Sequence, residues 1–153
     1  MSKRPLFLLS NDDGVHAPGL RALAEAVEPF GDVLIVAPHV ERSGASSMLS
    51  IHQPLRLEKI GPNIYAVEGS PVDCVLLALR RLVDRVPDWV ISGINRGGNL
   101  AQDTIYSGTV GAALEGSIHG IRAMAVSSHG APPYRYDTAA KVCLLYTSPS
   151  PRD

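Results

Sequence analysis

The stretch LFLLSNDDG, residues 6–14, decides the fold of this chain because it joins a short apolar run to a polar turn. The apolar half has the length typical of a strand that is buried on both faces. The polar half contains two adjacent carboxylates, Asp12 and Asp13, which repel each other by roughly 4 kcal/mol at about 4 Å and an effective dielectric near 20. Gly14 tolerates backbone angles closed to other residues, so the strand can break there and turn both carboxylates toward one point.

A hard divalent cation would offset this repulsion, because Mg²⁺ and Mn²⁺ prefer oxygen ligands. The residues therefore predict a metal site at Asp12 and Asp13. The alternative that the same residues allow is an Asx-type turn or a helix cap in which both carboxylates are simply solvated.

On either side of this stretch, patterns typical of strands alternate with patterns typical of helices. Strands are expected at residues 33–37, 89–94 and 123–127, paired extended segments at 55–60 and 64–67, and helices at about 20–27, 70–83, 109–119 and 136–145. This order predicts an α/β domain with a mostly parallel sheet covered on both faces. No internal repeat and no linker divides the chain into two domains.

The 153 residues are balanced in charge, with 14 basic and 15 acidic side chains, and 45% of them are hydrophobic. This balance argues against a broad nucleic-acid or membrane-binding surface. No apolar run is long enough to span a bilayer or to act as a signal peptide, so a cytoplasmic enzyme is expected. Cys74 and Cys143 belong to no paired framework and are expected to be unbridged.

Polar segments follow three of the expected strands, at residues 11–14, 42–44 and 92–99. Ligands bind outside the carboxyl ends of the strands in open α/β sheets, so these segments can converge on one crevice. Ser43 and Asn95 would then add neutral oxygen ligands to the aspartate pair and leave positions for water or phosphate oxygens, which fits Mg²⁺ or Mn²⁺. No spacing of His and Cys suggests zinc.

The segment YSGTVGAA, residues 106–113, is typical of a loop that leads into a helix. Free backbone N–H groups and the positive end of the helix dipole make such a helix start an anion site, and the hydroxyls of Ser107 and Thr109 add donors. The alternative is that either hydroxyl merely caps the helix and that the small residues permit tight packing. An anion site beside an oxygen-ligated cation suggests phosphate chemistry.

Four ordered motifs carry a family resemblance: SNDDG, APHVERSGAS, SGINRGGN and YSGTVGAALEG. Together they resemble the survival protein SurE family of metal-dependent nucleotidases over about residues 6–141. The resemblance implies a Rossmann-like three-layer sandwich with a mostly parallel sheet. It also implies one divalent ion, hydrolysis of nucleoside 5′- and 3′-monophosphates, and a homodimer or homotetramer.

The same resemblance, followed motif by motif, implies the residues of the site. It implies that the metal is bound by Asp12, Asp13, Ser43 and Asn95. It places around the phosphate the residues Asn99, Ser107, Gly108 and Thr109.

The motifs favour a phosphomonoesterase in which Asp12 and Asp13 are the catalytic residues. A water positioned by the metal is the expected nucleophile, because the Asp-x-Asp pattern of phosphatases that use an aspartate nucleophile is absent. The alternative is a non-catalytic nucleotide-binding module or an inactive fragment of such an enzyme. A dinucleotide-dependent oxidoreductase is disfavoured, because no G-x-G-x-x-G follows the first strand.

The end of the chain, CLLYTSPSPRD at residues 143–153, changes character abruptly. It begins as if continuing a helix and then turns into Ser/Pro alternation, which supports neither helix nor strand. We therefore expect residues 1–142 to be the N-terminal portion of a SurE-like domain that lacks its C-terminal part. Residues 143–153 are expected to be a non-native or disordered tail.

Overall fold

A six-stranded sheet forms the centre of the computed structural model, which describes residues 4–44, 46–50 and 53–147. The strand order is β3-β4-β2-β1-β5-β6, and every neighbouring pair is parallel except β3 with β4. The strands are β1 (Leu6–Ser10), β2 (Asp32–Pro38), β3 (Leu57–Gly61), β4 (Ile64–Val67), β5 (Trp89–Arg96) and β6 (Arg122–Ser128). The mostly parallel sheet and the paired segments expected near residues 55–67 are thus confirmed.

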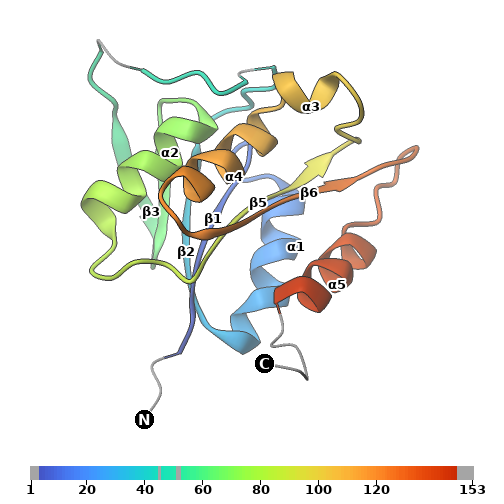
Figure 1. Ribbon diagram of the computed structural model, residues 1–153, viewed down its shortest axis with the longest axis horizontal. Coiled ribbons are helices and arrows are strands. Elements are labelled where there is room, and N and C mark those ends of the chain that lie inside the picture. The colour runs from blue at the N-terminus through green and yellow to red at the C-terminus, as the bar shows by residue number, and fades with distance from the viewer. Residues whose placement is uncertain (1–3, 45, 51–52, 148–153) are drawn as a thin grey trace.

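Helices cover both faces of this sheet and make the three layers that the resemblance implies (Figure 1). Helices α2 and α4 pack on one face, and α1 and α5 pack on the other. Their bounds are α1 (Pro18–Val27), α2 (Pro71–Leu77), α3 (Asp103–Tyr106), α4 (Gly108–Ile118) and α5 (Tyr136–Thr147). Short helical turns follow α1 at Glu28–Phe30 and α2 at Ala78–Leu82.

Helix α3 was not expected from the sequence. The loop that was expected to lead into the helix at residue 109 contains a helical turn of four residues. A helix of this length has no apolar periodicity that a sequence pattern can detect. Figure 1 shows α3 at the end of the sheet toward which β5 points.

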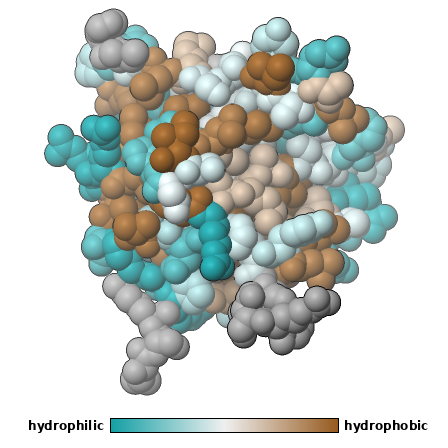
Figure 2. Space-filling view, viewed as in Figure 1, coloured by the Kyte–Doolittle hydropathy of each residue, from teal (hydrophilic) through white to brown (hydrophobic). Residues whose placement is uncertain are grey.

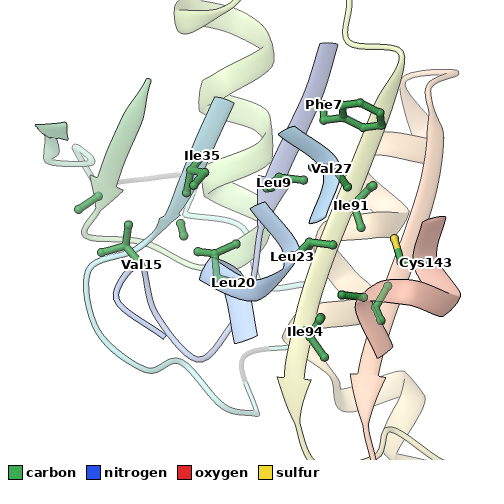
Figure 3. Packing of buried hydrophobic residues seen from close by; sticks show 14 residues of the cluster. Phe7, Leu9, Val15, Leu20, Leu23, Val27, Ile35, Ile91, Ile94 and Cys143 are labelled. Atoms are coloured by element: carbon green, nitrogen blue, oxygen red, sulfur yellow. The ribbon is translucent and has the colours of Figure 1, made fainter. Parts of the chain in front are cut away.

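Helix α1 illustrates how the local sequence sets the packing. Proline occupies its first position, where the missing N–H costs nothing, and Leu20, Leu23 and Val27 recur at helical spacing. These three side chains are almost fully buried. Figure 3 shows them facing the apolar side chains of the sheet, among them Leu9 and Ile91.

The sheet buries apolar side chains on both faces. Leu9 and Ile91 belong to the cluster under α1 and α5, whereas Leu8 and Val90 belong to the cluster under α2 and α4. All five residues of β1 are buried, which explains why its sequence is an apolar run rather than an alternation. The centre of the sheet therefore gives β1 a fixed position from which residues 11–13 emerge.

Helix α5 crosses the boundary expected at residue 142. It continues to Thr147, and the side chain of Cys143 is buried in the cluster under α1 and α5 (Figure 3). Residues 148–153 lie outside the described residues, so the division at residue 142 stays a prediction. Cys74 and Cys143 are both free, as expected.

The surface over α4 carries weakly polar and apolar residues, and strongly hydrophilic residues lie mostly toward the edges of the same face (Figure 2). Leu114 and Ile118 are exposed on this helix. Across the described part of the chain, none of the helices has the length and apolar character needed to cross a membrane.

Candidate metal and phosphate site

Asp12 connects the end of β1 with the start of α4. Its side chain is buried, and its Oδ1 accepts a hydrogen bond of 2.5 Å from the hydroxyl of Thr109, which has no exposed surface. A Cβ at Gly108 would lie 2.9 Å from the Cβ of Asp12, so only glycine allows this approach. The predicted metal residue and the predicted phosphate segment, far apart in the sequence, are therefore in direct contact.

Asp13 is held by the end of β5. Its Oδ2 accepts a hydrogen bond of 2.9 Å from the backbone N–H of Arg96. Burial raises the pKa of Asp13 above its ordinary value; the Arg96 N–H opposes this shift, and the charge of Asp12 adds to it. The two carboxylates are thus oriented by different neighbours, one by α4 and the other by β5.

Asn95 lies within the last residues of β5, one position before Arg96. Its Nδ2 donates to the carbonyl oxygen of Gly97 at 2.8 Å. The lone pairs of its Oδ1 can then coordinate a cation. The register of β5 shifts just before it, at Gly93. That glycine has a φ of 139°, and a Cβ there would lie 2.3 Å from the carbonyl oxygen of Val126.

Ser43 follows β2 and is exposed. Its hydroxyl donates to Glu41 Oε1 at 2.7 Å, and the N–H of Arg42 donates to the carbonyl oxygen of Asp12 at 2.7 Å. The backbone beside Ser43 is therefore fixed to the aspartate turn. Among the described residues, no hydrogen bond joins the Ser43 side chain itself to Asp12 or Asp13.

Ser107 caps helix α4. Its Oγ accepts a hydrogen bond of 3.2 Å from the N–H of Val110, which is the alternative role that the sequence allowed. The Thr109 hydroxyl donates its proton to Asp12, whereas the Ser107 hydroxyl accepts from Val110 and keeps its own proton to donate to an anion. The first backbone N–H groups of α4, at Gly108 and Thr109, have no intrahelical partner and are further donors for an anion.

Asn99 lies toward β6. Its Nδ2 donates to Ser127 Oγ at 2.8 Å, and its carbonyl oxygen accepts from the Thr104 hydroxyl at 3.3 Å. No hydrogen bond within the described ranges links Asn99 to the start of α4. Its assignment to the phosphate therefore stays a prediction.

Comparison with known proteins identifies the family. Residues 7–149 match the family model described as survival protein SurE. This chain belongs to the SurE family.

Curated relatives named 5′-nucleotidase SurE are similar over most of this chain. The protein of Vibrio parahaemolyticus is 50% identical over 144 residues, which are 93% of this chain and 55% of the relative. The protein of Geotalea daltonii is 56% identical over 121 residues, which are 79% of this chain and 49% of the relative. The chain thus spans about half the length of the curated relatives it matches.

A solved structure supports the same fold. The crystal structure of the SurE protein from Aquifex aeolicus matches with a TM-score of 0.89 and 44% identity, covering 94% of this chain and 58% of that chain. The expected SurE-like α/β fold is confirmed.

The oxygen atoms at the end of β1 fit a hard divalent cation. Asp12 and Asp13 offer carboxylate oxygens, and Asn95 offers an amide oxygen, the ligand types that Mg²⁺ and Mn²⁺ prefer. The part of the chain that the structure describes contains no cluster of three or more His, Cys, Asp or Glu side chains suited to a metal. A cation here would therefore need neutral oxygens and water to complete its ligand shell.

Buried oxygen atoms without partners lie directly behind the aspartates. Ser10 Oγ, Asn11 Oδ1 and Ser92 Oγ are buried and have no hydrogen-bond partner within the described residues. Ser10 and Ser92 are register partners in β1 and β5. Buried polar atoms rarely remain unpaired, so these oxygens make the adjoining ends of β1 and β5 an unusually polar part of the interior.

Two charged residues of this site were missed by sequence reasoning. Glu41 and Arg96 form an ion pair at 3.2 Å; Glu41 accepts from the Ser43 hydroxyl, and the Arg96 N–H donates to Asp13. The available signal was their position, because both lie at or just after the carboxyl end of a strand.

A separate cavity of about 830 Å³ lies on the α1 side of the sheet. It is lined by α1 and by strands β2 and β4, and it extends to Val15 and His16. None of the predicted site residues lines it; Asp12, Ser43 and Asn95 lie instead at or after the carboxyl ends of β1, β2 and β5.

Proposed function

We propose that this chain carries the metal and phosphate site of a phosphomonoesterase that hydrolyses nucleoside 5′-monophosphates, and also 3′-monophosphates, to nucleoside and phosphate. The observation that carries the proposal is the contact between Asp12 and Thr109. It sets carboxylates suited to a cation directly against a helix start suited to a phosphate. The relatives named 5′-nucleotidase SurE, at about half identity, support the substrate class.

In this mechanism, the residues of the chain bind and orient the phosphate ester. The first N–H groups of α4 face the negative phosphoryl oxygens and stabilise the charge that develops on them. Thr109 holds one oxygen of Asp12, and the Arg96 N–H holds one oxygen of Asp13, so that the remaining carboxylate oxygens have fixed directions. Asn99 and Ser107 complete the phosphate side, with Ser107 also keeping the helix start in place.

One divalent ion, Mg²⁺ or Mn²⁺, supplies Lewis-acid polarisation of a phosphoryl oxygen and a water of lowered pKa when it is bound. The residues that would hold it are Asp12, Asp13, Ser43 and Asn95. We further propose a cytoplasmic location and, as the family resemblance implies, assembly into a homodimer or homotetramer.

The direct test is a phosphate-release screen over nucleoside 5′- and 3′-monophosphates with Mg²⁺, Mn²⁺ or a chelator. The chain is assayed alone and fused to the C-terminal half of the Vibrio parahaemolyticus relative, because it spans about half of that protein. Release that requires a metal supports the proposal. Nucleotide binding without release from either protein would favour a non-catalytic binding module.

Thr109→Val is expected to lower kcat/KM for a nucleoside monophosphate by about tenfold or more. Valine has a similar shape but leaves the buried Asp12 oxygen without its donor, and a hydrogen bond to a charged group contributes roughly 1.5–3 kcal/mol. Thr109→Ser keeps the hydroxyl and is the matched control. Kinetics of the valine variant equal to those of the wild type would reduce Thr109 to a packing residue.

A further inference from the structure

A single carboxylate, that of Glu41, joins two of the loops that border the aspartate pair. Both of its oxygens accept hydrogen bonds from the Arg96 guanidinium, at 3.2 and 3.3 Å. Its Oε1 also accepts the hydroxyl proton of Ser43 at 2.7 Å. Glu41 thus contacts one proposed ligand directly and is linked through Arg96 to the strand end that carries another, Asn95.

The backbone on both sides of this pair is tied to the aspartate turn. The N–H of Arg42 donates to the Asp12 carbonyl oxygen, and the N–H of Arg96 donates to the Asp13 carboxylate. Gly14 packs so closely that a Cβ there would lie 3.4 Å from the backbone N of Glu41. The Glu41–Arg96 side-chain pair is a further link between the same two loops and adds a constraint on how far apart they lie.

We propose that Glu41 and Arg96 are a positioning pair that holds Ser43 and Asn95 at the separation required by the cation, an inference that rests on the proposed function. A hydroxyl that donates its proton to a carboxylate keeps its lone pairs for a ligand, so Glu41 also orients the Ser43 oxygen. Residues that hydrogen-bond to the ligands of a metal orient those ligands and change the affinity of the site for the metal.

An effect of charge alone predicts a different result. The negative charge of Glu41 attracts a nearby cation and the positive charge of Arg96 repels it, so removing the two side chains would change metal affinity in opposite directions. Positioning predicts the same direction for both, because either loss removes the side-chain link between the loops. The side chains are about half exposed, at 51% and 53%, so their removal should leave the fold intact.

The experiment measures Mn²⁺ binding to the chain itself by titration calorimetry, for Glu41→Ala, Arg96→Ala and the double variant. We expect each single variant to bind Mn²⁺ about tenfold more weakly than the wild type. We expect the double variant to be no weaker than the weaker single variant, because the two residues act as one unit. Circular dichroism melts without metal should coincide with that of the wild type.

Three further variants make the comparison specific. Glu41→Gln can still accept from Ser43, and Arg96→Lys can still pair with Glu41, so both should recover part of the lost affinity. Glu25→Ala removes another exposed ion pair, that with Arg21 on α1, and should leave Mn²⁺ affinity unchanged.

Tighter Mn²⁺ binding by Arg96→Ala, or unchanged affinity in both single variants, would overturn the positioning pair while leaving the proposed function intact. Strictly additive effects in the double variant would overturn it as well. A wild-type chain that binds no Mn²⁺ would overturn both the pair and the proposed function.

Discussion

Asp13→Asn is expected to weaken Mn²⁺ binding by more than about 100-fold. This is a larger loss than that found when a residue that only hydrogen-bonds to a metal ligand is removed. Asparagine has the same size and can still accept the Arg96 N–H, so the fold should persist while the charge is lost. Asp12→Asn should behave alike, since its amide oxygen can still accept from Thr109. Titration calorimetry of the chain and metal-dependent phosphate release from the fused protein measure the effect.

Asp32→Asn is the matched control for both aspartate variants. Asp32 begins β2, at the opposite end of the strands from the aspartate pair, and forms an exposed ion pair with Arg85. The Asp32→Asn variant should bind Mn²⁺ with the affinity of the wild type. Wild-type metal affinity in both Asp12→Asn and Asp13→Asn would refute the assignment of the site.

Gly19→Ala is expected to destabilise the fold by about 3 kcal/mol or more, at the upper end of the range for overpacked cores. A Cβ at this position would lie 2.0 Å from the carbonyl oxygen of Ile94, a backbone atom that cannot rotate away. Helix α1 would have to move off β5 and expose Leu20 and Leu23, which are buried there. Domains are stable by only about 5–15 kcal/mol, so a large fraction of the stability would be lost.

Urea denaturation of Gly19→Ala beside Gly61→Ala measures this effect. Gly61 lies in the edge strand β3, where a Cβ would make ordinary contact at 3.5 Å with the Ile64 side chain. The control should unfold within about 1 kcal/mol of the wild type, since isolated edge contacts contribute little. An equally small change for Gly19→Ala would show that α1 does not pack on β5 as described.

The elements of the fold could be predicted because their signals are local. Residues 6–10 are apolar without alternation because β1 is covered on both faces, and the pair Ser70 and Asp73 forms the capping box that starts α2. The order of strands is not local. No sequence pattern near β1 predicts that β2 and β5 pair with it. The shift in strand register at Gly93 likewise depends on the close approach of Val126 from β6.

The candidate site likewise contains residues that a local motif predicts and contacts that only the folded chain creates. Asp12, Asp13 and the small residues at the start of α4 could be selected because each group forms a short motif with its own chemistry. The bond between Asp12 and Thr109 could not be predicted from pattern, because 97 residues separate them. The ion pair of Glu41 and Arg96 spans 55 residues and depends on two loops that the sheet brings together.

The central position of β1 has a consequence for the order in which the site can form during synthesis. Asp12 leaves the ribosome early, but its neighbour β5 and its partner Thr109 follow only after most of the first 109 residues have been made. At about 5–20 residues per second, the aspartate pair therefore waits for several seconds without its partners. Parallel pairing over such separations is slow to form, so the contacts around Asp12 should close well after the local contacts within α1 have formed.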